Sequence, residues 1–231
     1  MSTHRRSARQ LKREILELLG SKDLDHAVDA LCQMPARQPI SPLLSLLTSI
    51  DQKIKWASVS ALGAVVANLA DQDMEAARII MRRLMWQLND ESGGIGWGCP
   101  ETMGEIMACH AGLAREYSEV LVSYVREDAN FLEYIPLQRG ALWGIARLAQ
   151  VDAQRVVASL PHLMPFLNGP DALLRGLSLL ALGLLGGPEG YPQIERLLGD
   201  NSEIELYWDR KLKVVTVMDL AIEALARLKK A

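Results

Sequence analysis

A motif of about forty residues recurs along this chain, and it restricts the fold more than any other feature. Five segments with apolar residues at helical spacing align on one small residue each, and these lie 41, 40, 39 and 41 residues apart: Gly63, Gly104, Gly144, Gly183 and Ala224. Another helical stretch precedes each segment, at 42–50, 73–88, 116–127, 152–167 and 191–198. Helix pairs that repeat in this way bury their apolar faces against their neighbours, as in an α-solenoid.

Two further amphipathic stretches precede the first pair, at 8–19 and 23–33. They predict an N-terminal helical cap, because the end of a solenoid needs an element that covers its open core. We therefore expect a cap at 1–40 and a repeat array at 41–231, which together form a single continuous domain.

The last repeat contains an insertion, EIELYWDRKLKVVTV, in which apolar and polar residues alternate on both sides of Asp209-Arg210. This alternation predicts a small β-hairpin between the two helices of that repeat. Thr216 and Asp219 then match a capping box that opens the final helix. Two prolines within 152–167 predict a break in the first helix of the fourth repeat.

Composition narrows the classes of protein. Hydrophobic residues make up 49% of the 231 residues, which predicts a packed core, and the formal net charge of −3 argues against a globally basic nucleic-acid binder. No apolar run approaches the roughly 18–20 residues of a membrane span, so we expect no membrane contact. The three cysteines, Cys32, Cys99 and Cys109, lack metal or redox spacing, which indicates free thiols and a cytoplasmic protein.

The start of the second helix of a repeat carries a recognisable pattern. In the fourth repeat Asp171 and Arg175 lead to Ala-Leu-Gly183, and in the first Asp51 and Lys55 lead to Ala-Leu-Gly63. In this pattern the chain resembles the HEAT-repeat proteins of the short bacterial kind. The resemblance implies an all-α, right-handed α-solenoid of about five HEAT-like helix pairs, in which the second helices line the concave surface and Asp–Arg pairs join neighbouring repeats.

Comparison of equivalent positions in the five repeats separates core from surface. The column seven residues before the aligned small residue is mostly apolar and includes Trp56 and Trp97, which favours core positions for both. The column five residues before it is polar or small and includes Cys99 and Arg139. That column predicts a solvent-facing line along the second helices, with Arg139 as its strongest binding candidate.

Glu101 and Glu105 occupy columns in which the other repeats place small or apolar residues. They are four residues apart and share one face of a helix, where buried like charges cost free energy unless a partner neutralises them. The expected partners are Arg82 or Arg83, Arg139, or a cationic ligand or partner residue. We favour a buried structural salt bridge over a binding site, and either over a metal or acid–base pair.

The segment LNDESGGIGWGCPE, residues 88–101, is the turn between the two helices of the second repeat. Its glycines do not match a phosphate-binding motif, and its carboxylates make its surroundings acidic. Because this turn leads into the helix that carries the two glutamates, we expect a binding site here if the chain has one. The candidate binding residues are Glu101, Glu105, Arg139, Asp90, Glu91, Trp97 and Cys99.

The sequence contains no catalytic set that we recognise, and we predict no cofactor and no metal site. We expect a non-enzymatic scaffold that binds another protein through the concave face, and we expect no nucleic-acid partner. Two alternatives remain open: a HEAT-like DNA alkylpurine glycosylase or nucleic-acid binder, and a bilin-lyase-like modification factor. The sequence does not decide the oligomeric state or exclude catalysis.

Overall fold

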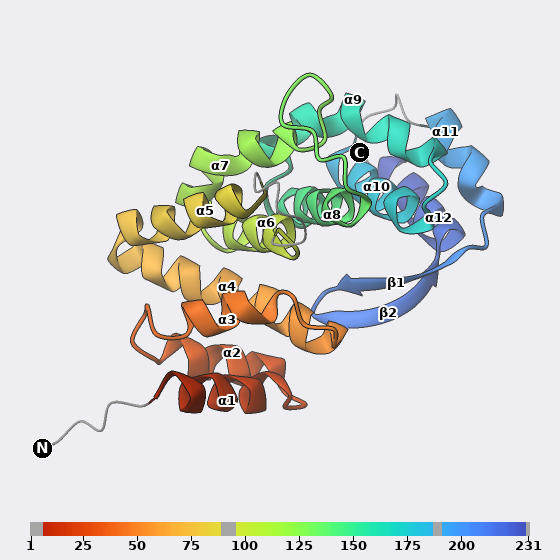
Figure 1. Ribbon diagram of the computed structural model, residues 1–231. Helices are drawn as coiled ribbons and strands as arrows, with labels where there is room; N and C mark the ends of the chain where they lie inside the picture. The colour runs from red at the N-terminus through yellow and green to blue at the C-terminus, as the bar shows by residue number, and fades with distance from the viewer. Residues whose placement is uncertain (1–6, 89–95, 187–190, 230–231) are drawn as a thin grey trace, which may run out of the picture.

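The computed structural model describes residues 7–88, 96–186 and 191–229 (Figure 1). The chain begins with three helices, α1 (Ala8–Leu19), α2 (Leu24–Cys32) and α3 (Ile40–Leu46). Helix α1 starts at a capping box formed by Ser7 and Gln10. The N-terminal helices and the repeats share one hydrophobic core, which extends from Ile15 to Leu225.

The repeats build two layers of helices, and these form the predicted α-solenoid (Figure 1). The second helices of the pairs pack against one another in a row: α4 (Gln52–Gln72), α6 (Cys99–Cys109), α8 (Ile135–Asp152), α10 (Ala172–Leu185) and α12 (Val217–Leu228). The first helices of the later pairs form the outer layer: α5 (Met74–Leu88), α7 (Ala111–Ser123), α9 (Leu160–Leu163) and α11 (Tyr191–Arg196). Helix α3 takes the position of the first helix in the first pair.

Close contact between neighbouring second helices explains the aligned small residues. A Cβ atom on Gly104 of α6 would overlap the backbone of Gly144 on α8, and one on Gly183 of α10 would come within 2.9 Å of the Cα atom of Ala224 on α12. The helices therefore touch backbone to backbone at these points. A larger residue there would separate two repeats, which is why the small residue returns in every repeat.

Local sequence signals determine where several helices begin. Asp51 caps α4 and Asp171 caps α10, each by accepting hydrogen bonds from backbone N–H groups of the first turn. The predicted capping box of Thr216 and Asp219 opens α12. Pro100 lies in the first turn of α6, where its missing N–H costs nothing.

The first helix of the fourth repeat is broken, as its prolines predict. Residues 153–168 form the short helix α9 together with three 3₁₀ turns, η1 (Ala153–Arg155), η2 (Val157–Ser159) and η3 (Met164–Asn168). The fifth repeat also ends its short α11 in a 3₁₀ turn, η5 (Leu197–Gly199). No helix within the described ranges is long and apolar enough to cross a lipid bilayer.

The predicted hairpin is present, with β1 (Glu203–Trp208) antiparallel to β2 (Lys211–Thr216). The turn residues Asp209 and Arg210 both have positive φ, 50° and 60°, as a type I′ turn requires. In Figure 1 the hairpin extends from α12 back along the row of second helices toward α4. Arg210 at its tip forms an ion pair with Asp25 of α2, so the hairpin joins the two ends of the array.

We predict that Gly104→Ala lowers the free energy of unfolding by about 2 kcal/mol, although alanine favours helix, because the methyl group forces α6 and α8 apart. Urea denaturation followed by circular dichroism measures this change. Gly199→Ala is the matched control, since a Cβ atom there meets no other atom within 4 Å, and it should change stability by less than about 0.5 kcal/mol. Equal effects of the two substitutions would contradict a special role for the contact.

Candidate functional site

An aromatic cluster fixes the hairpin against the second helices. The ring of Tyr207 on β1 stacks on Trp56 of α4, with ring centroids 4.7 Å apart and planes 11° from parallel. Its hydroxyl is 2.8 Å from the hydroxyl of Ser60, and its backbone carbonyl accepts a hydrogen bond of 2.7 Å from the indole N–H of Trp143 on α8. Trp208 packs edge-on against Trp143, with centroids 6.2 Å apart. Strand β1 therefore holds a defined place across α4 and α8.

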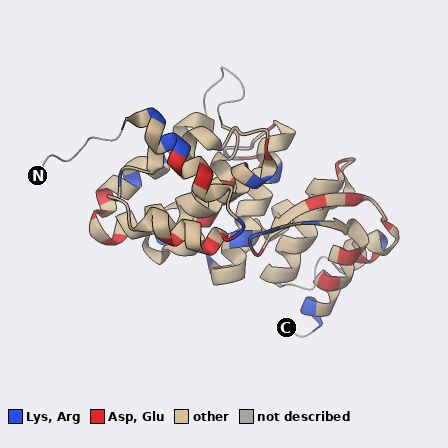
Figure 2. Ribbon diagram, turned by 90° about the horizontal axis from the view of Figure 1, so that it is seen from below, with Lys and Arg blue, Asp and Glu red and all other residues tan. Residues whose placement is uncertain are grey.

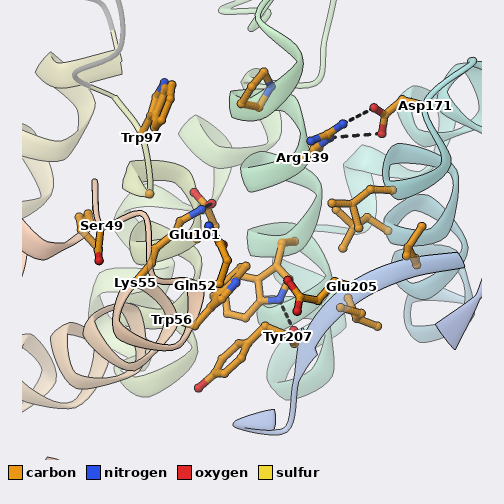
Figure 3. A pocket seen from close by; sticks show the side chains of 18 of the residues that line it. Ser49, Gln52, Lys55, Trp56, Trp97, Glu101, Arg139, Asp171, Glu205 and Tyr207 are labelled. Carbon is orange, nitrogen blue, oxygen red and sulfur yellow. Dashed lines mark hydrogen bonds and ion pairs between the residues drawn. The ribbon is translucent and has the colours of Figure 1, made fainter. Parts of the chain in front are cut away.

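The docked strand closes one side of a cavity of about 670 Å³, which we call the β1 groove (Figure 3). Its opposite wall consists of the N-terminal parts of α4, α6, α8 and α10 with the residues just before them. Two aromatic side chains of that wall are exposed: Trp97 is 44% accessible and Tyr134 52%. Polar and charged residues of the lining include Ser49, Gln52, Lys55, Glu101, Arg139, Asp171, Glu203 and Glu205.

Glu101 is a buried carboxylate in the wall of the β1 groove. Lys55 Nζ lies 2.9 Å from Glu101 Oε1 and 5.0 Å from the ring centroid of Trp56. Glu101 Oε2 has no hydrogen-bond partner among the described residues, and the whole residue is only 4% accessible. Its carboxylate rests on Gly140 of α8, where a Cβ atom would overlap Oε2. One buried acceptor in the groove wall is therefore unsatisfied, which costs free energy until a donor reaches it.

Arg139 and Asp171 form a second ion pair in the wall, between α8 and the cap of α10 (Figure 3). Arg139 Nε donates to Asp171 Oδ1 over 3.2 Å, and its terminal nitrogen donates to the other oxygen. Burial by itself would raise the pKa of Asp171. The hydrogen bonds from Arg139 and from the backbone N–H of Leu174 outweigh burial and lower the pKa of this carboxyl below its ordinary value.

The β1 side of the groove is acidic. Glu203 and Glu205 are exposed, and neither takes part in an ion pair within the parts of the chain that the structure describes. Lys55 and Arg139, in contrast, are paired with Glu101 and Asp171 in the opposite wall. Figure 2 shows acidic and basic positions interspersed along the array. The lining of the groove, in contrast, contains more acidic than basic residues.

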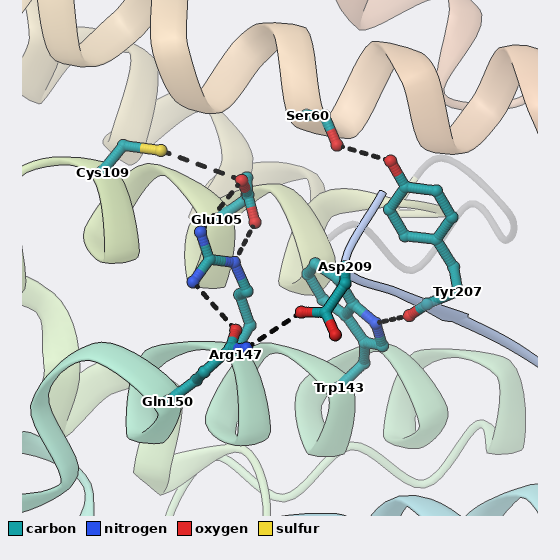
Figure 4. A network of polar contacts seen from close by, with 8 residues as sticks. All are labelled: Ser60, Glu105, Cys109, Trp143, Arg147, Gln150, Tyr207 and Asp209. Carbon is teal, nitrogen blue, oxygen red and sulfur yellow. Dashed lines mark hydrogen bonds and ion pairs between the residues drawn. The ribbon is translucent and has the colours of Figure 1, made fainter. Parts of the chain in front are cut away.

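Glu105 belongs to a different network, outside the β1 groove (Figure 4). Its Oε2 atom is 2.7 Å from Nε of Arg147 on α8, and its Oε1 atom is 3.8 Å from Sγ of Cys109. Gln150 accepts a hydrogen bond from Arg147 and donates one to Asp209 at the hairpin turn. This network joins α6, α8 and the hairpin on the far side of the aromatic cluster.

Both glutamates are thus buried in ion pairs, but the expected partners are wrong. Arg82 pairs with Glu75 in its own helix, and Arg139 pairs with Asp171. The actual cations, Lys55 and Arg147, are on the second helices of the neighbouring repeats. Comparison of the repeats identifies the unusual carboxylates. It does not identify the cation that faces each of them, because that depends on how one helix is rotated against the next.

The predicted solvent-facing column is also wrong, because Ser58, Cys99 and Ser178 are fully buried. The thiol of Cys99 donates to Gln87 Oε1 over 3.3 Å and does not line the groove. Burial and the nearby charge of Glu101 raise the pKa of this thiol to about 12, so it stays protonated at neutral pH. Arg139 of the same column is partly exposed in the groove and Asp219 is exposed, so the five positions do not share one environment.

The expectation that Trp97 is a core residue is wrong as well, because almost half of its surface is accessible in the groove. Of the candidate residues, Glu101, Arg139 and Trp97 line this one cavity, whereas Glu105 and Cys99 do not. Asp90 and Glu91 lie outside the described residues. Within the described ranges, no cluster of three His, Cys, Asp or Glu side chains could hold a metal ion.

Sequence reasoning missed the residues that the hairpin and the segments before α4 and α8 bring to the groove. The alternation in the insertion predicts strands, but it gives no sign of where they dock. The useful signal was the density of aromatic residues in β1, since Tyr-Trp in so short a strand needs a partner surface. The missed groove residues are Lys55, Trp56, Tyr134, Trp143, Glu203, Glu205 and Tyr207.

Comparison with solved structures supports the architecture. An engineered protein from the Northeast Structural Genomics Consortium matches with a TM-score of 0.54 and 18% identity, covering 95% of this chain and 96% of its own. A designed armadillo repeat protein in complex with the peptide (KR)4 matches with a TM-score of 0.53 and 18% identity, covering 95% and 99%. At such identities the likeness shows the fold, a helical-repeat solenoid. No protein-family model matches the sequence, and no curated protein matches it.

We predict that Arg147→Met lowers the free energy of unfolding by about 3 kcal/mol, because it leaves the buried carboxylate of Glu105 without its cation. The double variant with Glu105→Gln should recover much of the loss, since it removes the unpaired charge. Arg126→Ala, which breaks the exposed pair with Asp128, is the control and should have little effect. A similar result for Arg147→Met and Arg126→Ala in urea denaturation would refute the argument.

The lowered pKa of Asp171 predicts a pH-dependent contribution to stability. A carboxyl whose pKa is lower in the folded than in the unfolded state stabilises the protein above the unfolded value of about 3.9, and this stabilisation is lost as the pH falls through the folded value. Asp171→Asn keeps a good N-cap for α10 but removes the charge. Unfolding free energies from about pH 2 to 6 should therefore converge for the two proteins at low pH, and parallel curves would disprove this role.

Proposed function

We propose that this protein is a non-enzymatic scaffold that binds a segment of a partner protein in the β1 groove. One observation carries the proposal: a cavity of about 670 Å³ on the second-helix face holds exposed aromatic side chains beside buried, fixed charges. Exposed Trp and Tyr at the centre of a concave surface are typical of protein-binding sites, where they bury much area for little lost entropy.

The hairpin defines how a partner reaches the second helices. Tyr207 and Trp208 already cover the parts of α4 and α8 around Trp56 and Trp143. We propose that binding through the concave face takes place beside the hairpin, between β1 and Trp97, and not along the full row of helices. The wall there is rigid, because its charged residues are held by ion pairs between repeats, and a rigid site loses little entropy on binding.

The similarity to a designed armadillo repeat protein that binds the peptide (KR)4 supports a binding role, since the same arrangement of helices serves peptide binding there. We further propose that the array is of the short bacterial HEAT type, on the basis of the two-helix repeats and the Asp51 and Asp171 caps. We propose a cytoplasmic location on the basis of the free cysteines Cys32, Cys99 and Cys109. The unpaired carboxylates of Glu203 and Glu205 oppose a nucleic-acid partner at this groove, because they repel phosphate.

The proposal predicts that peptides selected for binding depend on Trp97. Random-sequence peptides displayed on phage would be selected against the whole protein, and the affinities of the enriched peptides measured by fluorescence anisotropy. Trp97→Ala should weaken binding at least about tenfold, as expected for loss of a central aromatic contact. The substitution should leave the fold intact, because Trp97 is 44% accessible.

Trp86→Ala is the matched control, since Trp86 is 76% exposed on α5 and does not line the groove. It should leave the affinities unchanged. Peptides that bind equally well to the Trp97 variant, or that lose binding only in the Trp86 variant, would place the binding surface elsewhere. Failure to enrich any peptide would count against a peptide-binding scaffold.

A further inference from the structure

Within the described residues strand β1 pairs with β2 alone, so one of its edges has no strand partner. The turn pairs Trp208 with Lys211 through backbone hydrogen bonds. Because hydrogen-bonded pairs alternate along an antiparallel ladder, the backbone N–H and C=O groups of Leu206 and Ile204 also bond to β2, and those of the residues between them point away from β2. The backbone N–H of Val217 donates to the carbonyl of Ser202, which agrees with this alternation. The backbone groups of Glu203, Glu205 and Tyr207 therefore lie on the free edge.

That free edge faces the β1 groove. The carbonyl of Tyr207, one of the outward-pointing groups, accepts its hydrogen bond from Trp143 of α8. Residues 203–207 all line the cavity, as expected where a strand presents its edge and not one of its faces. The outward backbone groups of Glu203 and Glu205, unlike the Tyr207 carbonyl, have no hydrogen-bond partner within the described chain.

The groove also presents unsatisfied negative groups to whatever enters it. The carboxylates of Glu203 and Glu205 flank the free edge without an ion-pair partner in the described parts of the chain. Glu101 Oε2, in the opposite wall, also lacks a hydrogen-bond donor within the described residues, but this atom is buried against Gly140 and is not open to the groove. The free backbone donors and acceptors of β1 and the exposed carboxylates beside them fit one kind of occupant, an extended chain that carries positive charge.

We infer that the β1 groove binds an extended segment with alternating basic residues, which adds to β1 as a third, antiparallel strand. This inference rests on the proposed function and names the chemistry of the partner. In an antiparallel pair, the residue opposite Glu205 exchanges both backbone bonds with it and projects its side chain from the same face. Lys or Arg at that position, and again opposite Glu203, pairs with these carboxylates.

Trp97 covers the segment from the opposite wall (Figure 3). The recognition mode is strand addition, in which main-chain bonds provide affinity and alternate side chains provide specificity.

Backbone methylation separates strand addition from simple charge attraction. The probe is a labelled peptide of about eight residues in which Lys and Val alternate, the length of an ordinary strand. The same peptide methylated on its Lys amides should bind the protein about tenfold more weakly, because those amides donate to the free edge. Methylation of the Val amides keeps composition and charge but should change affinity less than about twofold, since those amides point away from β1.

Side-chain charge is tested with two further measurements. The corresponding peptide of Glu and Val should bind at least about tenfold more weakly than the Lys peptide, with the difference shrinking at high salt. Glu205→Gln should weaken binding of the Lys peptide about threefold, as expected for one exposed ion pair. Glu119→Gln, at an exposed position of α7 outside the groove, is the matched control and should have no effect.

Equal binding of the two methylated peptides, loss confined to the Val-methylated one, or no preference for Lys over Glu would overturn the inference. These outcomes are distinct from failure of the proposed function. If displayed peptides bind in a Trp97-dependent way but are not basic, or tolerate methylation, the groove binds peptides by another mode. If no peptide binds in a Trp97-dependent way, both the proposed binding role of the groove and the strand-addition inference are wrong.

Discussion

The stacking of Tyr207 on Trp56 is the contact on which the rest of this site depends. It fixes a hairpin from the last repeat against a helix of the first, and the bond from Trp143 to the Tyr207 carbonyl orients the strand. Without this contact the second helices would present an open face. With it, β1 becomes the wall of a groove and its free edge is held toward the opposite wall.

Ion pairs between repeats form a second system that supports this arrangement. Lys55–Glu101, Glu105–Arg147, Arg139–Asp171 and Arg175–Asp200 each join adjacent repeats. Because these pairs link neighbouring repeats, they act on the angle between successive helices. Two of them also line the groove, so the same side chains that hold the array in shape set the charge of the candidate site.

Part of the site could be predicted from sequence because the repeat supplies its own reference. Glu101 stands out only when the equivalent residues of the other repeats are compared, and it is the buried carboxylate of the groove. The same comparison failed for Trp97, because equivalent positions of the repeats do not all face the core. At the second repeat the residue lies before α6, in the wall of a cavity whose other side is formed by β1. The prediction of a solvent-facing column failed for the related reason that equivalent positions differ in burial from repeat to repeat: Ser58, Cys99 and Ser178 are buried, whereas Arg139 lines the groove.

Sequence by itself determined the helix pairs, their period, the capped helix starts, the broken first helix of the fourth repeat and the hairpin with its turn. These features follow from local chemistry and from a periodic apolar pattern, which neighbouring residues encode. Only the tertiary structure decided which cations pair with Glu101 and Glu105, where Tyr207 docks, and that Glu203 and Glu205 face Trp97 across a cavity. Those relations join residues far apart in the sequence, 147 positions in the case of Ser60 and Tyr207, and they depend on the accumulated rotation of successive repeats.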